Sequence, residues 1–104
     1  MKKDDERQVA LLEKALSIRP AEHELRFEIA VRYSAMGRHP LALYHYKILT
    51  REAPDGSNLN NLGVTYANLE LPAKAVSQYK KAADVEETLA IRFVEESFLD
   101  ILVR

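Results

Sequence analysis

The chain has three histidines, the residue type best suited to proton transfer or metal binding near neutral pH. His23 and His39 fall at the starts of predicted helices, and His45 falls inside one, between Tyr44 and Tyr46. This spacing matches no zinc-binding motif. We therefore predict that the three histidines are solvated or packing residues and that the chain holds no metal.

Adjacent charges are the next candidates for chemistry. Glutamates adjoin at positions 86–87 and 95–96, and lysines adjoin at 80–81. The glutamates are most simply solvated helix charges, and two lysines are too short a basic run to indicate DNA or membrane binding. No nucleophile motif or phosphate-binding loop accompanies them. We predict a chain that is not an enzyme and needs no cofactor.

Composition narrows the class of protein further. The 104 residues allow one domain with a modest core, and a formal net charge of −1 favours no nucleic-acid partner. The chain has no cysteine, which excludes disulfides and fits a reducing compartment. Residues 1–7 are charged and lack the apolar segment of a signal peptide. No apolar run approaches the roughly 20 residues that span a membrane. We expect a cytoplasmic protein.

The apolar spacing predicts six helices and no strands. Gly37 supplies a left-handed helix end, and Glu70 stands where the second copy of that turn would need glycine, so we expect strain there. Asp55 or Ser57 can cap the fourth helix, and Thr88 can cap the sixth. The predicted helices cover residues 4–18, 22–36, 40–52, 58–69, 72–86 and 87–104.

The sequence contains an internal repeat that relates these helices to one another. Tyr33, Ala42 and Tyr46 recur 33 positions later as tyrosine, alanine and tyrosine, at 66, 75 and 79. A fixed period of this length is typical of stacked repeats. Ala30 recurs as Gly63, so small residues sit where two helices approach closely. We predict that the tyrosines and small residues are core.

The second copy resembles the tetratricopeptide repeat. The matching residues are Leu59, Leu62, Gly63, Tyr66, Ala75, Tyr79 and Ala82, and Glu87 replaces the closing proline. The first copy matches at Ile29, Ala30, Tyr33, Gly37, Ala42, Tyr46, Leu49 and Pro54, and departs at Arg26. The resemblance implies an all-α fold, a right-handed superhelical stack of antiparallel helix pairs.

The two ends resemble half-repeats. Residues 1–20 look like a second helix without its first, with Gln8 in place of the usual alanine, and 22–54 and 56–86 are full repeats. Residues 87–104 look like a first helix without its second, because Ile91, Val94 and Phe98 keep the spacing of the first-helix pattern. The single predicted domain therefore starts with a second helix of a repeat and finishes with a first helix of a repeat.

The resemblance implies a concave groove lined by the first helix of each pair. Asn61 matches a position where related proteins hold a peptide backbone through the side-chain amide, which both donates and accepts hydrogen bonds. Phe27 and Val31 occupy positions where the carboxylate-clamp version of the family has polar residues, so that clamp is rejected. The predicted groove residues are Glu24, Phe27, Glu28, Asn60, Asn61, Val64 and Asn68.

These features predict a protein-interaction scaffold that holds a peptide or helix in its groove. The alternative is self-assembly, with a dimer favoured over a head-to-tail chain, through the apolar last helix. That interface would use Ile91, Phe93, Val94, Phe98, Leu99, Ile101 and Leu102. A third possibility is an engineered or truncated piece of a longer array. The partner's identity is not encoded in any motif.

Overall fold

The computed structural model describes the backbone of residues 2–102 and the side chains of residues 3–92 and 94–96. Five helices and no strand lie within that range, which confirms the all-α prediction. They are α1 (Lys2–Ile18), α2 (His23–Ala35), α3 (His39–Glu52), α4 (Gly56–Asn68) and α5 (Pro72–Leu102).

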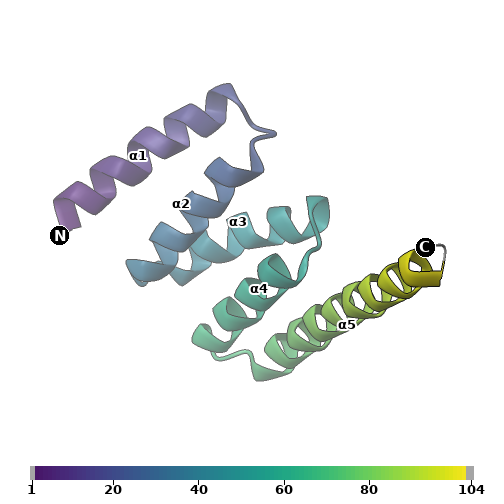
Figure 1. Ribbon diagram of the computed structural model, residues 1–104. Helices are drawn as coiled ribbons and strands as arrows, with labels where there is room; N and C mark the ends of the chain where they lie inside the picture. Colours follow the sequence, from purple (N-terminus) through teal and green to yellow (C-terminus); the bar gives the residue numbers. More distant parts are fainter. Residues whose placement is uncertain (1, 103–104) are drawn as a thin grey trace.

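The helices form an elongated stack (Figure 1). Each helix packs mainly on its neighbours in the sequence, and the molecule extends over 58 × 33 × 23 Å. Nearest-neighbour packing of this kind is the hallmark of a solenoid, in which each layer is covered by the next. The antiparallel pairs α2–α3 and α4–α5 are the two repeats of the sequence.

The helix ends follow the predicted turn residues. Pro72 begins α5, and Asp55 rather than Ser57 caps α4, its Oδ1 accepting from the backbone N–H of Asn58 at 2.8 Å. Gly37 and Glu70 both adopt left-handed backbone conformations, with φ of 74° and 61°. Glu70 therefore repeats the turn of Gly37 with a side chain that disfavours it, as predicted.

The core consists of the residues that the repeat predicted. Ile29, Ala30 and Ala42 are fully buried, and Tyr46 and Tyr66 are at least nine-tenths buried. Gly63 allows the closest approach, since a Cβ atom at this position would lie 2.6 Å from Cε1 of Tyr79. The predicted role of the small residues is thereby confirmed.

Tyr79 is an exception among the predicted core tyrosines. It is 36% exposed, whereas its counterpart Tyr46 is 3% exposed. Two features account for the difference: Phe27 packs against the Tyr46 ring, and α3 lies between α2 and α4, whereas α5 is the last described layer of the stack. The prediction that Tyr79 is wholly core is wrong for this reason.

The predicted boundary between a fifth and a sixth helix is also wrong, because α5 runs without interruption from Pro72 to Leu102. Residues 73–102 contain no glycine or proline that would end a helix. Thr88, the expected cap, instead donates from Oγ1 to the backbone oxygen of Asp84 at 2.9 Å, a bond made inside a helix. The chain thus has five described helices rather than six.

Candidate functional site

The best-formed part of the predicted groove is a hollow of about 340 Å³ between the N-terminal ends of α2 and α4. Glu24 and Phe27, both predicted groove residues, line it together with Ser57. Its other lining residues are His23, Leu49, Ala53, Asp55 and Asn58. Its lining therefore consists of three apolar residues and five polar or charged ones.

Several contacts hold the walls of this hollow in place. The half-buried ring of Phe27 packs edge-on against Tyr46, with ring centroids 6.4 Å apart. The side-chain Nδ2 of Asn58 donates to the backbone oxygen of Ala53 at 3.0 Å and joins α4 to the end of α3. His23 lies 3.2 Å from the Glu52 carboxylate across the same rim. All of these contacts form within the chain itself, so the walls of the hollow are preformed.

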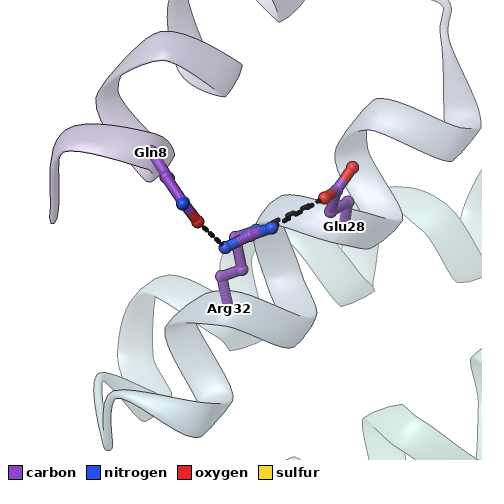
Figure 2. Close-up of polar contacts among 3 residues, drawn as sticks. All are labelled: Gln8, Glu28 and Arg32. Atoms are coloured by element: carbon purple, nitrogen blue, oxygen red, sulfur yellow. Dashed lines mark hydrogen bonds and ion pairs between the residues drawn. The ribbon is translucent and has the colours of Figure 1, made fainter. Parts of the chain in front are cut away.

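Glu28 lies apart from that hollow and already has a partner. Arg32 donates from Nη2 to Glu28 Oε1 at 3.0 Å and from Nη1 to Gln8 Oε1, so it links α1 to α2 (Figure 2). The negative charge of Glu28 in the predicted groove is therefore partly offset by the arginine. Gln8, placed where the repeat usually has alanine, is exposed and uses its polar group in this link.

The remaining predicted groove residues lie along α4. Asn60, Val64 and Asn68 are exposed, and Asn61 is half-buried. The Asn61 backbone oxygen accepts from Thr65 Oγ1 at 2.8 Å. Val64 and its repeat counterpart Val31 are 42% and 41% exposed, so both are apolar side chains on the surface and not in the core. None of these residues lines the 340 Å³ hollow, so their joint use as one groove stays a prediction.

The polar cluster that His45 forms with Arg26 and Glu13 was not predicted from the sequence. His45, only 4% exposed, accepts at Nδ1 from Arg26 Nη1 at 3.0 Å and donates from Nε2 to Glu13 at 3.0 Å. Its ring stacks on Tyr33, with centroids 5.9 Å apart. Burial lowers the pKa of His45 despite the opposing effect of Glu13. The sequence did contain one signal for this cluster. Arg26 stands where the repeat usually has an apolar residue, and an arginine inside the fold needs a polar partner.

The equivalent position in the second repeat is open. Leu59 and Gln78 stand 33 residues after Arg26 and His45, and they line a hollow of about 610 Å³ between α3, α4 and α5. Lys47, Arg51 and Lys81 also line it, with Asp84 as its acidic group. Its α4 residues are Leu59, Leu62 and Tyr66, none of which belongs to the predicted groove.

The predicted self-assembly surface is described only in part. Ile91 and Val94 are 52% and 65% exposed, and Leu89 beside them is 55% exposed. The side chains of the other predicted interface residues lie outside the described ones; they are Phe93, Phe98, Leu99, Ile101 and Leu102.

Within residues 2–102, no helix is both long and apolar enough to cross a lipid bilayer. Among the described side chains, no three His, Cys, Asp or Glu residues lie close enough together to hold a metal ion.

Comparison with known proteins supports the repeat fold. No protein-family model and no curated protein sequence matches this chain. The crystal structure of MamA, a tetratricopeptide-repeat protein, superimposes with a TM-score of 0.77 over 84% of the chain, at 24% sequence identity. The chain spans about half, 52%, of that MamA chain. It therefore has the fold of a tetratricopeptide-repeat array.

Proposed function

We propose that this chain is a non-catalytic protein-binding module that holds an extended peptide across α2 and α4. The observation that carries the proposal is the preformed hollow between these helices, with Phe27 at its apolar wall and Glu24 at its rim. The exposed valines at positions 31 and 64 would extend the apolar contact along both helices. The asparagines of α4 would supply backbone hydrogen bonds to the peptide.

A displayed library of random linear peptides, selected against the full chain, tests this proposal. Selected peptides should bind at least about tenfold more weakly to Val31→Glu and Val64→Glu, because a charge would replace apolar contact. Leu41→Glu is the matched control, since Leu41 is 43% exposed but lies on α3. Peptides that bind both valine variants as tightly as the parent chain would place their site elsewhere.

The amide of Asn61 gives a sharper test of how the peptide is held. Asn61→Ala should weaken a selected peptide by about 1–3 kcal/mol, because a paired backbone group of the peptide would lose its partner. Titration calorimetry with the selected peptide measures the loss. Gln78→Ala is the control, because it removes an amide on α5 that is not a predicted groove residue. An unchanged affinity for Asn61→Ala would contradict the assignment.

Self-assembly is a second candidate function, favoured by one specific observation. Every described side chain from Glu86 to Glu96 is exposed, including Leu89, Ile91 and Val94. An apolar helical surface without cover is typical of an interaction site. Light scattering on the eluting chain at high micromolar concentration measures the molar mass. A monomer under those conditions would exclude this candidate.

A further inference from the structure

The helix α5 contains parts of two different repeats. Its first half, residues 72–86, is the second helix of the last full repeat, and α4 packs on it. Its second half, from Glu87 onward, extends past the end of that repeat (Figure 1). In the preceding repeat, the chain turns at Pro54 and the next helix folds back on the stack. At the corresponding position, Glu87 continues the helix.

The first half of α5 consequently has an uncovered face. Tyr79 and Val76 are 36% and 48% exposed, whereas their counterparts Tyr46 and Leu43, one repeat earlier, are 3% exposed and half-buried. The helix α3, which carries those counterparts, packs on the following helix α4, the first helix of the next repeat. The uncovered face of α5 therefore corresponds to the face of α3 on which the first helix of the next repeat packs.

The second half of α5 has the sequence of such a helix. Ile91, Val94 and Phe98 keep the spacing of Leu59, Leu62 and Tyr66, the residues by which α4 packs. Ile91 and Val94 are more than half exposed in the single chain. Because one continuous helix carries both surfaces, residues 87–96 lead away from Tyr79 at about 1.5 Å per residue and cannot fold onto it.

Charge is divided between the same two halves. Residues 72–86 contain three lysines and two acidic residues, a net charge of +1. Residues 87–102 contain four acidic residues and one arginine, a net charge of −3. Two α5 helices laid antiparallel would place the acidic half of each beside the basic half of the other. Such pairing also steers the encounter of the two copies.

We propose that residues 87–102 of one copy cover the exposed face of α5 in a second copy, in the place of the first helix of a third repeat. The inference rests on the self-assembly proposed above and names its surfaces. The exchange is reciprocal, so it closes a two-fold dimer through the α5 end of each stack. The segment thus acts as an exchanged element, and the stack of each copy is completed by the other.

The variant Glu87→Pro tests the exchange, with Glu87→Ala as its matched control. Proline removes a backbone donor within α5 and favours a turn, and Thr88 is then free to cap a separate last helix. Sedimentation velocity of the full chain should give a dimer for the parent and for Glu87→Ala, and a monomer for Glu87→Pro with parental helical circular dichroism. A Glu87→Pro dimer of parental affinity would overturn the exchange while leaving self-assembly intact.

Two further variants keep the test decisive if Glu87→Pro folds poorly. Val94→Glu and Tyr79→Glu lie on the two proposed partner surfaces, and each should raise the dimer dissociation constant at least about tenfold. Leu41→Glu, on α3, should leave it unchanged. An effect at Val94 without one at Tyr79 would overturn the proposed docking face. A parent chain that is monomeric throughout would overturn both self-assembly and the exchange.

Discussion

The buried ring of His45 connects three helices through its two nitrogens. Arg26 on α2 has only N–H groups to offer, so Nδ1 of His45 must accept, and Nε2 carries the proton that Glu13 on α1 receives. This neutral tautomer satisfies both neighbours without placing a second positive charge beside Arg26. Protonation at Nδ1 would break the bond to the arginine, which accords with the lowered pKa of His45.

The lowered pKa of His45 predicts how stability changes with pH. In the unfolded chain the histidine titrates near 6.5, and in the folded chain burial moves its pKa below that value. The stabilisation is therefore complete above about pH 6.5 and is lost as the pH falls toward the folded pKa, by at most about 1.4 kcal/mol per pH unit. Urea unfolding at pH 7.5 and at lower pH measures the loss.

A histidine substitution identifies the source of that pH dependence. His45→Gln should flatten the decline in the free energy of unfolding, because glutamine does not titrate in this range. Glutamine is also the residue at the equivalent position 78. His23→Gln is the matched variant, since it makes the same replacement at an exposed histidine. An equal decline in the parent and in His45→Gln would contradict the assignment.

At the scale of the helices, the two repeats end their first helices with the same turn but different residues. After α2 the turn residue is Gly37, and after α4 it is Glu70, each with positive φ. In both turns the next N–H, of Arg38 or Leu71, donates to a tyrosine carbonyl, at 2.8 Å and 2.9 Å. The shared bonding shows that packing of the following helix imposes the turn even where the residue disfavours it.

Glu70→Gly should therefore stabilise the chain, by about 1 kcal/mol, because a left-handed backbone is unfavourable for a residue with a Cβ atom. Glu70 is exposed, so little contact is lost with its side chain. Gly37→Glu is the mirror-image change and should destabilise by a similar amount, since no atom lies within 4 Å of the added Cβ. Urea midpoints of both variants check the pair. A less stable Glu70→Gly would mean that the carboxylate contributes more than the strain removes.

Helix type and most helix ends could be predicted because their causes are local. Pro72 begins a helix, Gly37 ends one and Asp55 caps one through interactions within a few residues. The continuity of α5 could not be predicted in this way, since Thr88 suits both a cap and an interior bond to Asp84. The repeat register favoured a turn there, and the absence of any helix-breaking residue decided against it.

The residues of the candidate sites likewise differ in whether their positions have local or long-range causes. Glu24 and Phe27 were assigned to the groove by the resemblance to the repeat family, and both line the 340 Å³ hollow. Their use in binding stays a prediction. The pairing of Arg32 with both Glu28 and Gln8 joins two helices and depends on their packing distance. The contact of His45 with Glu13 likewise spans 32 positions in the sequence. Such contacts follow from tertiary packing and have no periodic signature.

At the scale of the whole molecule, the stack is a one-dimensional array whose two ends differ. At the N-terminal end, α1 is tied to α2 and α3 by polar links through Arg32 and His45. At the other end, the described side chains of residues 87–92 and 94–96 are all exposed. In such arrays local stability follows the packing of each layer on its neighbours. The proposed exchange would therefore stabilise the last half of α5 more than the other described helices.

Hydrogen exchange should accordingly depend on protein concentration in this segment. The amides of residues 87–96 should exchange rapidly in dilute solution, because little packing opposes local opening of the helix. Above the dimer dissociation constant, each tenfold rise in free protein should slow their exchange up to about tenfold, as binding adds about 1.4 kcal/mol. Amides of α2, which packs on α1 and α3, should respond less. Mass spectrometry of the exchanged chain over a dilution series measures both segments. If hydrogen exchange of residues 87–96 were the same at every concentration, association would contribute nothing to the stability of this end and the proposed exchange between two copies would be contradicted.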